Sequence, residues 1–238
     1  MHYAFEGCEN ILEVDLSPAT NLGMVYTGAF KGCTGLKTAK LSSGITVIGA
    51  EAFYNTAIKE LVIHEGAREL FEALSGMDSL EYLEIPLSYF YNHSITNYYQ
   101  YKASFGGLFG KGKSELGSIE QHYNYISGST TIKESLTYRI PLSFKRVKLT
   151  GECDTIPELM FENCSYLEEV IVPASVTTIG SNAFTGTTCK AFFESSTFLK
   201  AYKAAKYYYY YQEQCPSDPV TTGQTWRYVD GKPTIWTE

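Results

Sequence analysis

Apolar residues recur along the chain in short alternating groups. In the segment IVPASVTTIGSNAF, residues 171–184, an apolar run meets a proline, passes into Ser and Thr, and ends in Gly-x-x-Ala-Phe. A second segment, KLSSGITVIGAEAF, residues 40–53, keeps the same spacing of Ile-Gly and Ala-Phe. Alternation over a few residues predicts short strands, and the second copy predicts a repeat.

Aligning the chain on the aromatic residue gives four clear copies and two divergent ones. The clear copies start at residues 4, 29, 52 and 160 and read AFEGCENILEVDLS, AFKGCTGLKTAKLS, AFYNTAIKELVIH and MFENCSYLEEVIVP. The divergent copies start at residues 73 and 183 and read ALSGMDSLEYLEIP and AFTGTTCKAFFES. Phe30 and Phe53 are 23 residues apart (53 − 30), as are Phe161 and Phe184 (184 − 161). Such a period is typical of a solenoid, in which each unit buries its apolar face only against its neighbours.

Within a unit, the apolar positions divide into a strand and a return segment. Leu167, Val170 and Val172 have the spacing of inward-pointing residues on a short strand, which the following proline ends. Val176 and Ile179 are expected to re-enter the core on the return segment, and Gly180 to permit a tight turn without a side-chain clash. The repeat aromatic residues should then stack on one another along the solenoid.

The recurring positions resemble the BspA-like leucine-rich repeat family, whose units read approximately A-F-x-x-C-x-x-L-x-x-[IV]-x-[IV]-P-x-x-[IV]-x-x-I-G-x-x. The match covers about residues 4–86 and 146–194. The resemblance implies an α/β repeat solenoid with a parallel β-sheet on its concave face. It also implies a secreted or surface-anchored protein, because several members of this family in bacteria and some protozoa are adhesins.

The period fails between Pro86 and Phe144, where the chain is rich in Tyr, Gly and Ser. Nearly 60 residues are too many for a structureless loop inside a compact fold. The closing motif YRIPLSFKRVKL, residues 138–149, is similar to the end of insertions in the same family. We expect short strands and one short helix packed on a flank of the solenoid.

After Ser195 the repeat stops and two other patterns follow. SSTFLKAYKAAKYY, residues 195–208, has helical spacing, and WRYVDGKPTIW, residues 226–236, has the Asp-Gly signal of a hairpin. Helix and hairpin together are expected to cap the last open core. The predicted organisation is one leucine-rich-repeat domain over residues 1–238, made of N-terminal repeats 4–86, an insertion 87–145, C-terminal repeats 146–194 and a cap 195–238.

The N-terminus has no comparable cap, which suggests that upstream repeats were removed or that Phe5 is left partly exposed. Because the chain begins inside a repeat, we expect a signal peptide to have been removed with them, so its absence does not argue against an extracellular or cell-surface location. The open end could also stack against another copy of the chain.

Composition and charge exclude several classes of partner. The 238 residues are 44% hydrophobic and 19% charged, which is enough to form a core. A formal net charge of −7 argues against binding to nucleic acid, and no apolar run approaches the ~20 residues that span a bilayer.

The cysteines and histidines do not form a recognisable reactive site. Three of the six cysteines follow the repeat aromatic by three residues and are expected to be buried free thiols: Cys8, Cys33 and Cys164. The others have no zinc-ligand spacing, although a Cys189–Cys215 bridge tying the cap to the last repeat stays open as an alternative. The four histidines lie in unrelated segments and no hydrolase or phosphate-binding motif occurs. The sequence therefore predicts no enzyme, metal or cofactor.

The outward residues of the sheet are the informative surface. They are expected in two columns, one with Glu13, Thr38, Glu60, Tyr82, Arg146, Glu169 and Ala191 and the other with Asp15, Lys40, Val62, Glu84, Lys148, Ile171 and Phe193. The favoured interpretation is structural, with cross-strand pairs such as Glu84/Lys148 and Arg146/Glu169. The alternative is a ligand surface, since aromatic residues and Arg dominate binding hot spots. Its candidate residues are Tyr82, Glu84, Arg146, Lys148, Glu169, Ile171 and Phe193.

Three functions are compatible with these patterns. The first is a non-enzymatic interaction or adhesion domain that binds an extracellular protein through the concave face or the insertion. The second is a carbohydrate-binding module that uses exposed Tyr and Trp of the insertion and cap. The third is a passive spacer in a longer wall-anchored protein, because a fold does not fix a function.

Overall fold

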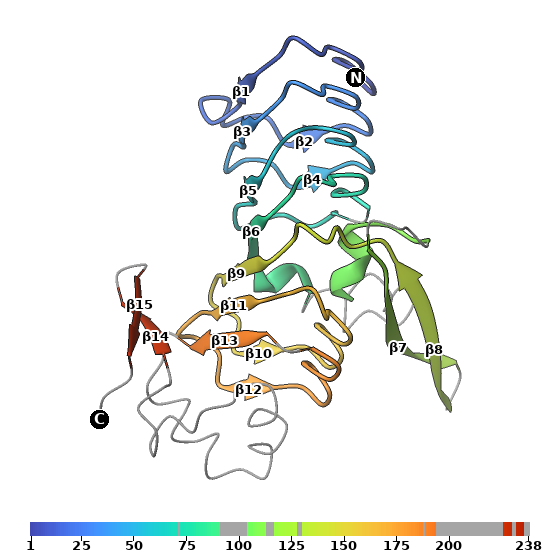
Figure 1. Ribbon diagram of the computed structural model, residues 1–238, viewed down its shortest axis with the longest axis vertical. Helices are drawn as coiled ribbons and strands as arrows, with labels where there is room; N and C mark the ends of the chain where they lie inside the picture. Colours follow the sequence, from blue (N-terminus) through green and yellow to red (C-terminus); the bar gives the residue numbers. More distant parts are fainter. Residues whose placement is uncertain are drawn as a thin grey trace.

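The computed structural model describes residues 1–70, 72–90, 104–112, 117–127, 130–187, 189–193, 226–229 and 232–235. Side chains are described for all of these except 124–127, 130–133, 190, 192–193 and the last two segments. The chain winds into a column of stacked turns, with strands on two of its walls (Figure 1). The predicted solenoid is confirmed.

The longer strands line the first wall. They are β1 (Glu13–Asp15), β3 (Thr38–Lys40), β5 (Glu60–Val62), β6 (Tyr82–Pro86), β9 (Arg146–Thr150), β11 (Glu169–Val172) and β13 (Lys190–Phe193). β1 pairs with β3, and a five-stranded parallel sheet has the order β13-β11-β9-β6-β5.

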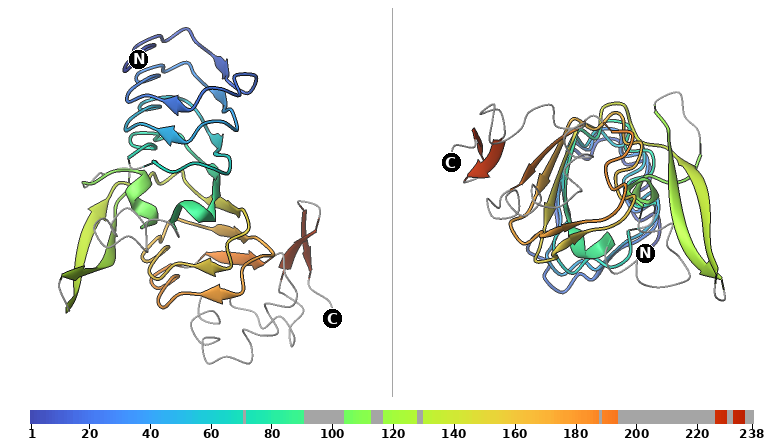
Figure 2. Two further views of the ribbon diagram at one scale, coloured as in Figure 1. Left: turned by 180° about the vertical axis from the view of Figure 1, so that it is seen from behind. Right: turned by 90° about the horizontal axis from the view of Figure 1, so that it is seen from below.

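Two-residue strands line the second wall. They are β2 (Met24–Val25), β4 (Val47–Ile48), β10 (Thr155–Ile156) and β12 (Thr178–Ile179), which pair in parallel as β2-β4 and β10-β12. Seen along the column, the turns enclose the core (Figure 2). Most predicted inward positions are buried, since Leu167 is 2% exposed and Val170, Val172 and Val176 are fully buried. Ile179 packs against the core but is only partly buried.

The third side of each turn carries the repeat aromatic residues. The ring of Phe30 stacks on those of Phe5 and Phe53, with centroids 5.2 and 5.5 Å apart. Phe161 and Phe184 stack in the same way at 5.3 Å. At the open end the outer face of Phe5 is uncovered, and its side chain is 47% exposed.

Each of these turns places two residues in the left-handed backbone region, with φ between 55° and 72°. One lies two residues before the repeat aromatic residue, or before Leu74 in the turn that lacks one, and the other lies two residues after it. The following position is occupied by Gly7, Gly32, Asn55, Gly76, Asn163 and Gly186. Only Gly and Asn fill it because they tolerate positive φ better than other residues.

Gly180 has a different role from the one predicted. Its φ lies outside the left-handed region. A Cβ at Gly180 would overlap the backbone of Pro157 and Glu158, and one at Gly49 would overlap Thr27. The glycine does avoid a clash, but with the preceding turn of the solenoid, because backbones of successive turns approach closely here.

The insertion supplies a turn of the solenoid. β6 and β9 pair directly although Pro86 and Arg146 are 60 positions apart (146 − 86). The 3₁₀ helix η2 (Phe105–Leu108) lies between the turn at residues 72–76 and the turn at residues 160–164. The ring of Phe105 lies 5.1 Å from that of Phe161 at an interplanar angle of 46°, so the insertion adds a tilted aromatic ring to the column.

A buried glutamine completes the hydrogen bonds of this junction. Between regular turns, the N–H of the residue two after the aromatic donates to the next turn, as from Gly32 to the Tyr54 carbonyl at 2.8 Å. At the junction, Nε2 of Gln121 donates to the carbonyls of Met160 and Glu162 at 3.1 and 2.8 Å, and its Oε1 accepts from Gly106 N–H at 2.7 Å. The side-chain amide thus takes the place of a missing peptide group.

Gln121 belongs to a hairpin on the flank of the solenoid, formed by β7 (Ile119–Ser127) and β8 (Thr130–Tyr138). This hairpin extends away from the stacked turns (Figures 1 and 2). Strands on a flank are therefore present as predicted, but each has nine residues, and the short helix η2 lies in the column between two turns rather than on the flank.

The C-terminal hairpin is also present. β14 (Trp226–Val229) and β15 (Lys232–Ile235) pair antiparallel, with Val229 opposite Lys232. The helix predicted from residue 195 onward lies outside the described residues. The capping role of this region stays a prediction.

Candidate functional site

The outward side chains of the first wall form a polar surface, here called the sheet face. Strand alternation produces it, because each buried residue is flanked by outward ones, as Leu61 is flanked by Glu60 and Val62. Parallel pairing in register then aligns the outward residues of successive strands, with Tyr82 between Glu60 and Arg146.

Tyr82 is held in place by two charged neighbours. Its hydroxyl donates to Oε1 of Glu84 at 2.8 Å, and the guanidinium of Arg146 lies 5.2 Å from the centre of its ring. Nε of Arg146 in turn lies 2.9 Å from Oε2 of Glu169. The cation over the aromatic ring, together with a separate carboxylate bound to each of the two side chains, restricts the rotamers of both.

Both predicted cross-strand ion pairs are confirmed. Besides Arg146–Glu169, Nζ of Lys148 lies 3.3 Å from Oε2 of Glu84. These side chains are between 24% and 48% exposed, so each pair stabilises the fold by at most about 1 kcal/mol. Stabilisation of the sheet is therefore a sufficient explanation for these two ion pairs.

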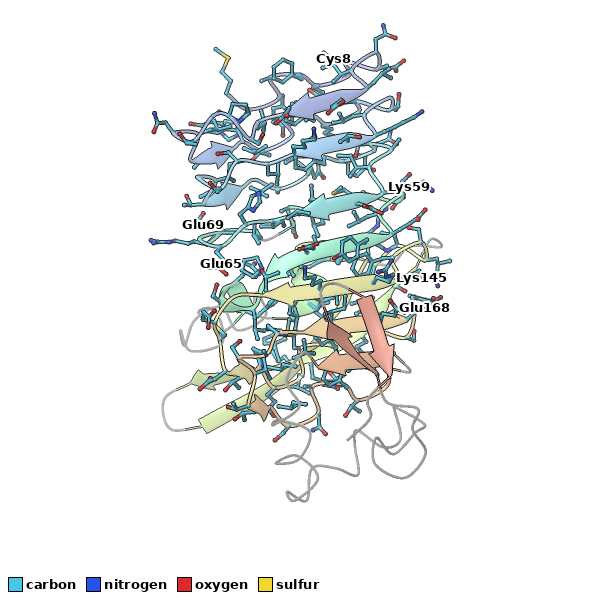
Figure 3. The ribbon with its side chains drawn as sticks, turned by 90° about the vertical axis from the view of Figure 1, so that its left-hand side faces the viewer. Cys8, Lys59, Glu65, Glu69, Lys145 and Glu168 are labelled. Carbon is cyan, nitrogen blue, oxygen red and sulfur yellow. The ribbon has the colours of Figure 1, made fainter. Side chains whose placement is uncertain are left out.

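Further ion pairs neutralise most of the remaining charge near this surface. Lys40 lies 3.4 Å from Glu13, and this hydrogen bond raises the pKa of the Lys40 ammonium. At the edge where the strands begin, Lys59 lies 2.6 Å from Glu81 and Lys145 lies 3.2 Å from Glu168. Figure 3 shows Lys59, Lys145 and Glu168 along this edge.

Two outward residues of β5 are not engaged in this way. In the part of the chain that the structure describes, Glu60 makes no ion pair or side-chain hydrogen bond, and Val62 is 39% exposed. Both lie next to β6, with Glu60 opposite Tyr82 and Val62 opposite Glu84. Both residues belong to the predicted outward columns, but neither is among the predicted ligand-binding residues. The sequence does contain a signal that Glu60 lacks an ion-pair partner, because its neighbours in the column, Thr38 and Tyr82, carry no charge.

The prediction that Ile171 is an accessible contact residue is wrong. It occupies an outward register position beside Lys148, but its side chain is only 3% exposed. β14 packs near β13, and Figure 3 shows the C-terminal hairpin in front of this end of the sheet. The sheet face is therefore covered at its C-terminal end, which the strand pattern alone does not indicate.

The predicted register of the last strand is also wrong. Phe193 pairs with Val172, a fully buried position, and Phe192 is the residue beside Ile171. Likewise Ala191 pairs with Val170. Phe184 precedes Ala191 by 7 residues, whereas Phe161 precedes Val170 by 9, so the divergent copy is two residues shorter and not one as the prediction assumed.

The predicted burial of the three repeat thiols is confirmed for Cys33 and Cys164 and wrong for Cys8. Cys33 and Cys164 are buried, and burial raises the pKa of both thiols, whereas Cys8 is exposed at the open end. Cys189 is 1% exposed, and Cys215 lies outside the described residues, so the proposed bridge between them stays a prediction.

Neither a metal-binding cluster nor a membrane-spanning helix occurs among the described residues. Among them, no group of three or more His, Cys, Asp or Glu could hold a metal ion. No helix in the same residues combines the length and the apolar character that crossing a bilayer requires.

Comparisons with solved structures found bacterial repeat proteins. A leucine-rich repeat protein from Bacteroides ovatus is 23% identical with a TM-score of 0.43, the match covering 80% of this chain and 45% of that one. A leucine-rich cell surface protein from Faecalibacterium prausnitzii is 21% identical with a TM-score of 0.28, covering 82% and 50%. A leucine-rich repeat protein from Eubacterium ventriosum is 17% identical with a TM-score of 0.28, covering 82% and 57%. The chain thus spans about half the length of these proteins.

A search of curated proteins found no match. A family model described as the BspA type leucine-rich repeat region matches residues 1–100 and 116–214, in six copies. The period of 23 residues, the stacked aromatic residues and this match agree with one another. The protein belongs to the BspA type leucine-rich repeat family.

Proposed function

We propose that the protein is a non-enzymatic interaction module, located outside the cell or on its surface, that binds a protein partner through the sheet face around Tyr82. Family membership supports an interaction role and a surface location in general. The choice of this surface rests on its own geometry.

The arrangement of Tyr82 carries the proposal. Its ring is held by Glu84 and Arg146 and lies beside Glu60 and Val62, which no neighbour neutralises or covers in the described structure. A rigid aromatic residue loses little side-chain entropy on binding, and Tyr and Arg are enriched in binding hot spots. A partner with a cation facing Glu60 and an apolar group over Val62 would complement this surface.

The test is a combined array of extracellular-matrix proteins and glycans, probed with the purified protein and a Tyr82→Ala/Arg146→Ala variant. A matched control is Tyr26→Ala/Arg68→Ala, which removes the same residue types at exposed positions near the second wall. We expect the face variant to lose at least tenfold in affinity for a protein partner and the control to bind normally. Unchanged binding of the face variant would contradict the proposal. Binding to glycans alone would favour a carbohydrate-binding module. Absence of binding to every protein and glycan on the array would favour a passive spacer.

Two structural proposals accompany this function. The four segments of the chain form one domain, which the direct pairing of β6 with β9 across the insertion supports. The open end stacks on another copy, which the exposure of Phe5 at 47% and Leu12 at 63% supports. Sedimentation as a monomer at high concentration would argue against this association.

A further inference from the structure

The β7–β8 hairpin has protected edges near its base. On β7, the Glu120 carbonyl accepts from Nδ2 of Asn163 at 2.7 Å, and the His122 N–H donates to Oε2 of Glu162 at 2.6 Å. Together with Gln121, these contacts fix β7 against the turn at residues 160–164. The hairpin is therefore firmly attached to the solenoid where it begins.

The outer edge of β8 is protected at its base by a different segment. Residues 110–112 run antiparallel to it, with Gly112 N–H donating to the Thr137 carbonyl at 2.9 Å and Arg139 N–H donating to the Gly110 carbonyl at 3.0 Å. This short segment already acts as a third strand of the hairpin, although only for about three residues.

Beyond this point the outer edge of β8 has no partner strand among the described residues. In an antiparallel pair, residues with outward backbone groups lie opposite each other and alternate along the strand. Thr137 lies opposite Glu120 and Ser135 opposite His122, so Ser135 directs its N–H and C=O away from β7, as Thr137 does. Among the described residues nothing pairs with the backbone of Ser135 on that side. The same alternation directs Lys133 and Thr131 outward.

We propose that this open edge, the outward backbone groups of residues 131–135, binds an extended segment of a partner protein by strand addition. The added strand would lie antiparallel to β8, in line with residues 110–112, and would satisfy donors and acceptors that are otherwise left to water. Since the hairpin is anchored through Gln121, a fully buried side chain, the edge is already in the conformation that a strand requires.

Two side chains define the chemistry of the partner. Leu136 is half-buried and Glu134 is exposed, and because they are two residues apart they point to the same side of the hairpin. The carboxylate of Glu134 accepts from the hydroxyl of Tyr123. An added strand that places an apolar residue beside Leu136 and a Lys or Arg beside Glu134 would bury the first and bring an opposite charge to the second. The partner segment is therefore a strand with apolar and basic residues at alternate positions. This surface is separate from the sheet face and does not depend on it.

The test is amide hydrogen exchange of the whole protein followed by NMR at several protein concentrations. Without a probe, the Ser135 amide should exchange at least tenfold faster than that of Leu136, which pairs with Gln121 inside the hairpin. The probe is the acetylated and amidated peptide Thr-Val-Thr-Lys-Thr-Val-Thr at millimolar concentration. It should slow Ser135 exchange at least tenfold and leave Leu136 unchanged.

Two altered peptides serve as controls that cannot affect folding of the protein. The same sequence N-methylated at alternate residues has no donors on the pairing edge and should give no protection. Replacing its Lys by Glu should weaken the effect, because the peptide then faces Glu134 with a like charge.

Three outcomes would overturn the proposal. Slow exchange of Ser135 at every concentration without the peptide would show that the chain covers its own edge. Slow exchange only at high protein concentration would assign the edge to a second copy. Fast exchange that the peptide does not change would show that the edge does not accept a strand of this chemistry.

Discussion

The regular turns and the insertion junction solve the same hydrogen-bonding problem with different groups. Between regular turns, backbone N–H groups reach backbone carbonyls, as from Phe30 to Ala52 at 2.8 Å. At the junction, part of this ladder is replaced by the side-chain amide of Gln121. A solenoid can therefore accept a long insertion when the facing backbone groups stay paired and the insertion adds an aromatic ring to the core.

The largest effect is expected from removing the aromatic residue that the insertion contributes. Phe105 is fully buried against Phe161 and Phe144, so Phe105→Ala should destabilise the protein by about 3–5 kcal/mol, as much as Phe53→Ala in a regular turn. Phe5→Ala should cost only about 1 kcal/mol, because that ring is 47% exposed. Urea unfolding of the three variants measures this, and a cost for Phe105→Ala no larger than that of Phe5→Ala would show the insertion to be an appendage.

The next effect concerns the buried amide. Gln121→Leu should leave the Gly106 N–H and the Glu162 carbonyl without partners and should destabilise the protein by about 2–4 kcal/mol. His122→Ala, the neighbouring control, removes a half-exposed side chain and should cost less than about 1 kcal/mol. Equal costs in urea unfolding would mean that Gln121 is not essential to the junction.

A smaller effect is expected where regular turns approach each other. Ala at Gly49 or Gly180 places a methyl group against the backbone of the preceding turn and should cost about 1–3 kcal/mol. Gly23→Ala is the control, since nothing lies within 4 Å of the added Cβ, and its effect should stay within about 0.5 kcal/mol. Thermal unfolding distinguishes the two cases, and similar midpoints for all three variants would rule out close approach as the reason for these glycines.

The smallest expected effect is an increase in stability. Glu72 has φ 57°, in the position that Gly28 fills in an earlier turn, so Glu72→Gly should raise stability by about 0.5 kcal/mol. Glu158→Gly is the control, because its backbone is not left-handed and glycine there should lower stability. Loss of stability in both variants would indicate that the left-handed turn carries no strain.

The regular part of the fold could be predicted from the sequence because one pattern is repeated. The spacing of Leu167, Val170 and Val172 is sufficient to identify the inward face, and the ion pairs of Arg146 and Lys148 follow from aligning the copies. The register failed at Phe193 because the last copy is shorter by two residues, and a shift by one residue exchanges the two faces of a strand.

The junction could not be predicted because its partners are far apart in sequence. Gln121 is an ordinary polar residue in an alternating strand, and its burial depends on Gly106, Met160 and Glu162. Likewise, Ile171 sits at an outward position but is buried at the end of the sheet where the C-terminal hairpin lies. Neither feature leaves a periodic signal, since each arises from a contact that occurs once.

In the structure η2 forms a turn of the solenoid, which lets β6 pair with β9 and places Tyr82 beside Arg146. Amide hydrogen exchange of Glu72 and Leu74, which donate to the Gly107 and Leu108 carbonyls of η2, tests it most directly. If η2 is such a turn, these amides should be protected from exchange as strongly as those of Phe30 and Gly32 in the regular turns. Fast exchange at Glu72 and Leu74, with Phe30 and Gly32 slow, would contradict it.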